Sequence, residues 1–186
     1  MKILPILSCL LLSFAIPAHA EVSPIHMDIE QTQKTESKGK ATTKGGPPPS
    51  EKIQSRSLAI RLLNNSNESF DGLVVKYWFF GHEMTGHEIK ALKNGERKAS
   101  LGPRGKETVE SAPESSTYVE AHTEAGKGKG AKATKVPASG EKITGYAVQV
   151  LNGEKIMAEY YSEPSFKQKL AEPAKQPAEA AKPKAK

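Results

Sequence analysis

Apolar residues alternate with polar ones in a series of short runs between Ser57 and Tyr161, and turn residues separate the runs. Such alternation predicts half-buried β-strands. In the run 57–63, Leu58, Ile60 and Leu62 fall on one face. The run 71–81 carries apolar side chains on both faces, which is typical of a central strand covered on both sides. Further strands are predicted at 88–101, with a turn at Asn94-Gly95, and at 106–111, 116–125 and 144–161.

The run 144–161 is predicted to form a hairpin around Asn152-Gly153. A two-residue turn there would place apolar residues opposite charged ones on one face. A three-residue loop, with Gly153 in the left-handed conformation, pairs apolar residues with each other: Val148 with Ile156 and Tyr146 with Ala158. Because a slip of one residue moves every side chain to the other face, the pattern predicts the three-residue loop.

The segment 162–170 follows the hairpin and is predicted to form one helical turn. Ser162 is expected to cap this turn, and Phe166 and Leu170 are expected to pack back on the sheet. The aromatic residues of the hairpin divide by face. Tyr146 and Tyr160 are interpreted as core residues. Met157 and Tyr161, on the other face, are candidates either for an exposed contact or for packing against the final helical turn.

These runs amount to about seven short strands in roughly 115 residues, with no long helix. The predicted fold is all-β, a two-sheet β-sandwich over residues 51–170. Two sheets would cover both faces of the strand that contains Trp78, which is interpreted as a core side chain.

The two ends of the chain have a different composition. Residues 1–20 have a basic start, an apolar stretch and a small-residue cleavage site, as in a secretory signal peptide, and no other segment is apolar enough to span a membrane. Within 21–50, an N-terminal arm with alternating Ile25, Met27 and Ile29 can add as a strand to a sheet edge, and a Pro/Gly/Lys linker follows from residue 31. The Pro/Ala/Lys tail 171–186 is predicted to be disordered.

The net charge of +6 at first suggests a nucleic-acid partner. The basic excess, however, lies in the linker, in the tail and in one Gly-rich stretch rather than on a predicted strand face. We therefore predict no nucleic-acid binding. The lysines of the Gly-rich stretch remain candidates for contact with an anionic polymer: Lys127, Lys129, Lys132 and Lys135.

The segment FGHEMTGHE, residues 80–88, is close to the zinc-protease motif H-E-x-x-H. Its second histidine, however, follows five residues after the first, so the two would differ by roughly 140° around a helix. A predicted strand also leads into the segment, which excludes the protease interpretation. A loop could still bring His82 and His87 together, with His122 as a third ligand, and this is the alternative site.

No other catalytic pattern stands out. After removal of residues 1–20 the chain has no cysteine, because Cys9 is the single one. The sequence has no G-x-S-x-G motif, and Gly126 to Gly130 lacks the spacing of a phosphate-binding loop. We therefore predict a protein that is not an enzyme and that needs no cofactor.

Two segments carry a resemblance to a known class of proteins. VVKYWFFG, residues 74–81, and GYAVQVLNGEKIMAEYYSEPSFKQKL, residues 145–170, resemble small exported bacterial β-sandwich proteins. The layout from Ser57 to Leu170 is also similar to an immunoglobulin-like exported protein encoded with type IV pilus assembly components. The resemblance implies an immunoglobulin-like fold and a role beside a pilus or on the cell surface, and it implies no catalytic residue.

The resulting hypothesis is an exported, non-enzymatic binding or structural module in the periplasm or on the cell surface. Envelope or pilus proteins are its expected partners. The alternative is a periplasmic domain that binds a ligand or a metal through loop 81–88.

Overall fold

The computed structural model describes residues 23–38, 51–124 and 132–171. Within these ranges the chain forms ten strands and one short helix. They are β1 (Ile25–Lys38), β2 (Glu51–Asn64), β3 (Phe70–Glu83), β4 (Lys90–Leu101), β5 (Lys106–Glu110), β6 (Glu114–Val119), β7 (His122–Glu124), β8 (Thr134–Val136), β9 (Ser139–Asn152), β10 (Lys155–Tyr161) and α1 (Ser165–Ala171). The predicted signal peptide, residues 39–50, Lys127, Lys129 and the tail after Ala171 lie outside the described residues.

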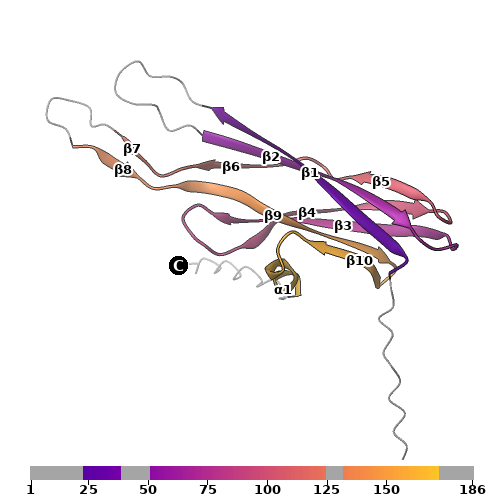
Figure 1. The fold of residues 1–186 in the computed structure, drawn as a ribbon. Helices are drawn as coiled ribbons and strands as arrows, with labels where there is room; N and C mark the ends of the chain where they lie inside the picture. The colour runs from indigo at the N-terminus through magenta and orange to yellow at the C-terminus, as the bar shows by residue number, and fades with distance from the viewer. Residues whose placement is uncertain (1–22, 39–50, 125–131, 172–186) are drawn as a thin grey trace, which may run out of the picture.

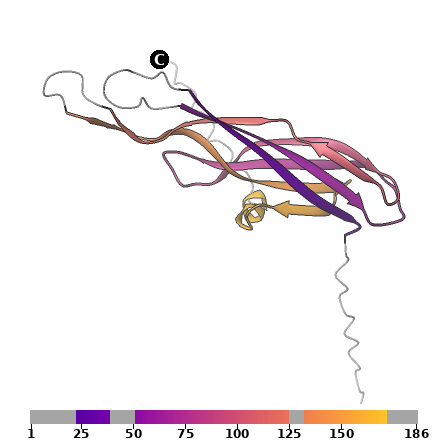
Figure 2. The same cartoon turned by 45° about the horizontal axis from the view of Figure 1, so that its top comes forward.

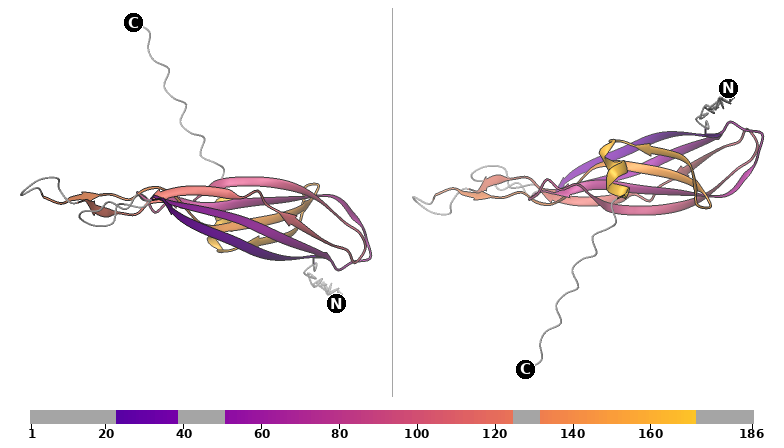
Figure 3. Two further views of the ribbon diagram at one scale, coloured as in Figure 1. Left: turned by 90° about the horizontal axis from the view of Figure 1, so that it is seen from above. Right: turned by 90° about the horizontal axis from the view of Figure 1, so that it is seen from below.

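The prediction of an all-β fold is confirmed. One large antiparallel sheet has the order β1-β2-β6-β9-β3-β4, with β5 paired to β2 and β10 paired to β9, and β7 and β8 form a second, two-stranded sheet. The large sheet folds over on itself, so that β1, β2 and β5 lie on one side of a shared core and β3, β4, β9 and β10 on the other (Figures 1 and 3). No helix in the described ranges has the length and hydropathy needed to cross a membrane.

The fold-over depends on a close approach of β6 and β9. The two strands pair only at Tyr118–Gly140 and Val119–Ser139. Gly140 has φ +88°, and a Cβ there would lie 2.2 Å from the carbonyl oxygen of Thr117. A glycine is therefore required where the sheet passes from one layer to the other.

The core lies between the two layers, as the alternation of the sequence predicts. Leu58, Ile60 and Leu62 point inward from β2, and they face Tyr77 and Phe79 from β3. All five side chains are almost completely buried. Inward residues of the other strands complete this cluster: Ile25, Phe70, Leu73, Val75, Ala99, Leu101, Val109, Ile143, Tyr146, Val148, Val150 and Met157.

The first strand is longer than the sequence indicated. β1 pairs with β2 from Ile25–Asn64 to Lys38–Glu51, so residues 31–38 form a strand where a linker was predicted (Figure 2). From Thr32 onward every side chain of β1 is exposed. This part therefore buries little apolar surface, and backbone hydrogen bonds rather than an apolar face hold it in the strand.

Asn94-Gly95 is not a turn, contrary to the prediction, and both residues lie in the middle of β4. Gly95 pairs with Tyr77 of β3, and a Cβ on Gly95 would lie 2.3 Å from the Tyr77 hydroxyl. The Tyr77 ring crosses the space above Gly95, and its hydroxyl accepts a hydrogen bond from the Ala112 N–H at 3.1 Å. The glycine thus makes room for an aromatic ring on the neighbouring strand.

Replacing Gly95 by alanine is expected to lower the free energy of unfolding by about 1–3 kcal/mol, because the added methyl group overlaps the Tyr77 ring. Chemical denaturation measures the change. Gly102→Ala is the matched control, since a Cβ there meets no atom within 4 Å. In a Tyr77→Leu background the penalty should largely disappear; an equal penalty in both backgrounds would contradict this account of Gly95.

The β9–β10 hairpin has neither of the two registers considered from the sequence, and the predicted three-residue loop is wrong. Asn152 pairs with Lys155, so the loop is Gly153-Glu154, and a bulge at Met157 follows. Gly153 has φ +59°, and a glycine at the first of two loop positions is the pattern of a type II′ turn. This register buries Met157 in the core and leaves Tyr160 43% exposed, the reverse of the prediction.

The helix α1 covers part of the outer face of the β3–β9 layer, as seen from below in Figure 3. Phe166 is completely buried and stacks on Phe80, with 4.3 Å between the ring centroids. The Ser162 hydroxyl accepts a hydrogen bond from the Tyr146 N–H at 2.9 Å, so it anchors the chain to β9 rather than capping the helix as predicted. Trp78 is half-buried and packs beside Phe80 and Phe166 on the outer face of the layer. It does not lie in the core between the layers, where the sequence placed it.

Candidate functional site

The three histidines of the alternative metal site lie on separate parts of the fold. His82 is at the end of β3, His87 is exposed on the β3–β4 loop, and His122 is on β7 in the two-stranded sheet. The Glu83 carboxylate, a further candidate ligand, receives a hydrogen bond from Lys90 at 2.6 Å, and this contact lowers its pKa. In the described parts of the chain, no three His, Cys, Asp or Glu side chains are arranged to hold a metal ion.

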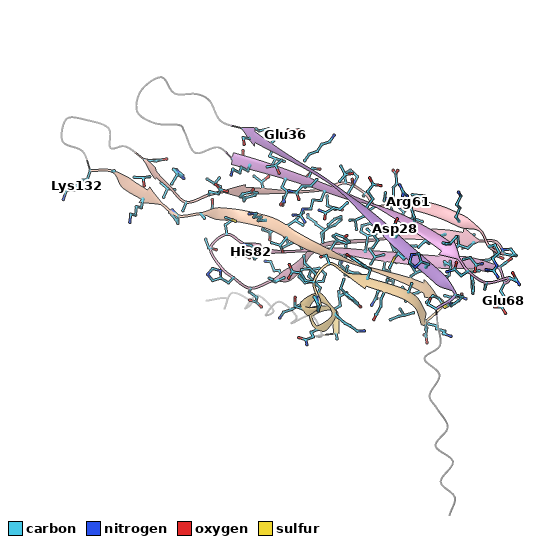
Figure 4. All side chains as sticks on the ribbon, viewed as in Figure 1. Asp28, Glu36, Arg61, Glu68, His82 and Lys132 are labelled. Carbon is cyan, nitrogen blue, oxygen red and sulfur yellow. The ribbon has the colours of Figure 1, made fainter. Side chains whose placement is uncertain are left out.

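The basic residues of the predicted polyanion site are only partly described. Lys132 and Lys135 are exposed beside and on β8, well away from His82 (Figure 4). In the same small sheet the His122 ring lies 3.1 Å from the Glu120 carbonyl oxygen and 3.5 Å from the Glu124 carboxylate. Lys127 and Lys129, the other two lysines of the predicted site, lie outside the described residues.

The N-terminal arm pairs within its own chain. Ile25 is buried, Met27 and Ile29 are partly buried, and all three pack against the core from β1. Ion pairs on the outer face link β1 to β2, where Arg61 lies 3.1 Å from Glu30 and 3.9 Å from Asp28 (Figure 4). The arm is therefore the edge strand of the layer that contains β1, β2 and β5.

The edge of β4 is protected against a further strand. Arg97 pairs with the core residue Val75, so its position faces inward, yet its side chain is exposed. The Glu107 carboxylate of β5 accepts a hydrogen bond from the Ser100 N–H at 2.8 Å. Inward-facing charges and occupied backbone groups are devices that prevent edge-to-edge pairing.

The edge of β10 differs from that of β4 because it exposes large apolar side chains. Three large hydrophobic side chains are exposed among the described residues, and two of them, Ile156 (46%) and Tyr160 (43%), are on β10. A groove of about 440 Å³ runs along this strand, lined by Ser23, Ile156, Met157, Ala158 and Glu159. The β10 edge therefore combines open space with exposed apolar side chains.

β1 approaches this groove at one end. The Ser23 hydroxyl donates a hydrogen bond to the Met157 carbonyl oxygen, which points away from β9. No ladder between β1 and β10 is found in the described residues. The two strands thus enclose a groove that is closed at Ser23 and open along the rest of β10.

A tyrosine pair lies near the end of β10, next to the core. The rings of Tyr146 and Tyr160 stack with 5.7 Å between their centroids. Burial and the neighbouring Tyr160 raise the pKa of Tyr146 to about 12, so Tyr146 is uncharged at neutral pH. The exposed Tyr160 ring offers an apolar surface to a side chain of a bound segment.

The sequence did not identify this edge, because its exposure depends on the hairpin register. Gly153 followed by Glu154 was the available signal, since glycine at the first loop position favours a two-residue II′ turn. Comparison of the chain with protein-family models, with curated proteins and with solved structures finds no match.

Proposed function

We propose that this protein is a non-enzymatic binding module that takes up an extended segment of a partner protein along the open edge of β10. The observation that carries the proposal is the contrast between the two edges of one layer. The β4 edge has a charged residue at an inward position and a backbone N–H that is bonded to Glu107. The β10 edge exposes Ile156 and Tyr160, and an open groove runs along it. In strand addition the backbone hydrogen bonds supply affinity and the side-chain pockets supply specificity.

The proposal includes location and partner class. The signal-like residues 1–20 support export to the periplasm or the cell surface. The two layers around one core support an immunoglobulin-like β-sandwich, and with it a role beside envelope or type IV pilus proteins. Tyr160 lies on the inner face of β10, and the bulge at Met157 turns Ile156 to the outer face. A segment that adds along β10 would therefore need an apolar residue on each face, one opposite Tyr160 and one opposite Ile156.

Site-specific photo-crosslinking in cells tests the proposal. A crosslinker at position 160 is expected to give one dominant adduct with an envelope or pilus protein, and a crosslinker at position 97 on the β4 edge is the matched control. The crosslinked partner segment is then synthesised as a peptide. Its affinity for the purified protein should fall at least about tenfold in the Ile156→Lys/Tyr160→Lys double variant, because two charges replace the apolar contacts.

Two results would contradict strand addition at β10. One is equal labelling from positions 160 and 97. The other is a peptide that binds the double variant as tightly as the unaltered protein.

A further inference from the structure

A second surface lies on the outer face of the layer formed by β3, β4, β9 and β10. Its side chains are not used by the proposed strand addition. The strand register places Asn94, Trp78, Ala147 and Tyr161 in one row across four strands. The adjacent row is Glu96, Lys76, Gln149 and Glu159. Polar groups therefore lie in a line beside an aromatic row on a sheet face.

Trp78 is held in place on this face. It packs against the cluster of Phe80, Ala147 and Phe166, which fixes one side of the indole next to α1. The other side borders a hollow of about 300 Å³, lined by Lys76, Trp78, Asn94, Gly95 and Glu96. The ring is thus a preorganised apolar surface with polar side chains around it.

The polar groups on the two sides of Trp78 differ in what they bind. On the β10 side, Gln149 donates a hydrogen bond to the Tyr161 hydroxyl at 2.9 Å, and that hydroxyl donates to Glu159 at 2.9 Å. Lys167 of α1 pairs with the same carboxylate and lowers its pKa. These groups satisfy each other and form a fixed border.

On the β4 side, the polar side chains have no such partners. Within the described residues no hydrogen bond or ion pair engages the side chains of Lys76, Asn94 or Glu96. An amide, a carboxylate and an ammonium group therefore surround the hollow with their hydrogen-bonding capacity unused. The charges nearly balance: Lys76 lies opposite Glu96, Lys167 pairs with Glu159, and Lys98 in the next row adds one positive charge.

We propose that this face binds an uncharged chain of hexopyranose sugars. The C–H groups on one face of a pyranose ring are apolar and bury well against an indole ring, while the hydroxyl groups at the ring edge need donors and acceptors in the same plane. Trp78 supplies the apolar surface, and the donors and acceptors come from Asn94, Glu96 and Lys76. This small net charge disfavours a polyanion, which would require a strongly basic face.

Trp78 is the single tryptophan of the chain, so its fluorescence reports directly on this face. The mature chain, residues 21–186, is titrated with β-linked oligomers of glucose and of N-acetylglucosamine. The expected result is a saturable blue shift of the emission with at least one series of oligomers. The apparent affinity should change less than about twofold between low and physiological salt. Retention on insoluble cellulose or chitin provides a second measurement that does not depend on tryptophan.

Variants locate the site. Asn94→Ala and Glu96→Gln are each expected to weaken binding at least about fivefold, and Trp78→Ala should abolish retention on the polysaccharide. Trp78→Phe keeps most of the packing against Phe80 and should bind weakly while melting like the unaltered protein. Tyr160→Ala, on the β10 groove, is the control and should bind sugar normally, which separates this site from the proposed strand addition.

The proposal is overturned if neither oligomer series alters the emission up to about 10 mM and neither polysaccharide retains the protein. It is also overturned if a chain that ends at Ala171 shows, without sugar, a red shift relative to residues 21–186. In that case residues 172–186 are the occupant of this face. Binding that Asn94→Ala, Glu96→Gln and Trp78→Ala leave unchanged would likewise place the sugar elsewhere.

Discussion

Deletion of residues 23–38 is expected to abolish the cooperative thermal unfolding of the domain. The deletion removes β1 and the whole ladder along one edge of β2. It exposes the core side of β2, where Leu58, Ile60 and Leu62 are at most 1% exposed in the intact chain. Loss of an edge strand from a small β domain leaves too little buried apolar area to offset chain entropy.

Calorimetry and circular dichroism measure this effect, and a synthetic peptide of residues 23–38 provides the sharper test. When added in excess, the peptide should restore a melting transition whose midpoint rises with peptide concentration, as expected for a ligand that binds the folded state. The outer-face variant His26→Ser is the matched control and should melt normally, because His26 is exposed. A deletion variant that melts like the intact protein would contradict the role given to β1.

Replacing Phe166 by alanine is expected to lower the free energy of unfolding by about 3–5 kcal/mol. The ring is completely buried, stacks on Phe80 and fills the space above Gly145, where a Cβ would lie 2.4 Å from it. Its removal leaves a cavity under α1 and detaches the helix from the sheet. Denaturant unfolding gives the loss in stability.

Fluorescence gives an independent measurement of the same change. Trp78 packs against the Phe166 cluster, so its emission should shift to the red when α1 detaches. Gln168→Ala, at an exposed position on the same helix, is the control and should change stability by less than about 0.5 kcal/mol. A loss below about 1 kcal/mol for Phe166→Ala, with unchanged emission, would show that α1 does not depend on this contact.

Period-two alternation predicted the parts of the fold in which one face is buried. Leu58, Ile60 and Leu62, and the run from Leu73 to Phe79, have the inward positions that the sequence assigns. Phe166 also returns to the sheet as expected. These positions were predictable because a residue's own neighbours in the sequence define the apolar face.

The errors arose where a partner strand determines the local structure. Asn94-Gly95 has the composition of a turn, but the Tyr77 ring on the next strand requires a glycine there. The bulge at Met157 changes which side of β10 faces the core, and no alternation within the strand shows it. Trp78 lies outside the core because the β3 strand uses its other face for the interior.

The candidate surfaces were harder to predict than the core. The sequence drew attention to histidines and lysines, but the edge of β10 depends on exposure of Ile156 and Tyr160. The sugar-binding face that we propose depends on pairing across four strands, from Asn94 to Tyr161. The strand register determines both surfaces: it sets which side chains of β10 are exposed, and it brings together residues of the sugar-binding face that are far apart in the sequence.

The exposed end of the β1–β2 ladder has a consequence for how the molecule opens. From Thr32 to Lys38 the side chains of β1 are exposed, whereas Ile25 is anchored in the core. Amide hydrogens in the outer part should therefore exchange with solvent through local fraying, orders of magnitude faster than those near Ile25. A protease that cuts within 32–38 would leave Ile25, Met27 and Ile29 in place, and the nicked domain should keep its melting transition.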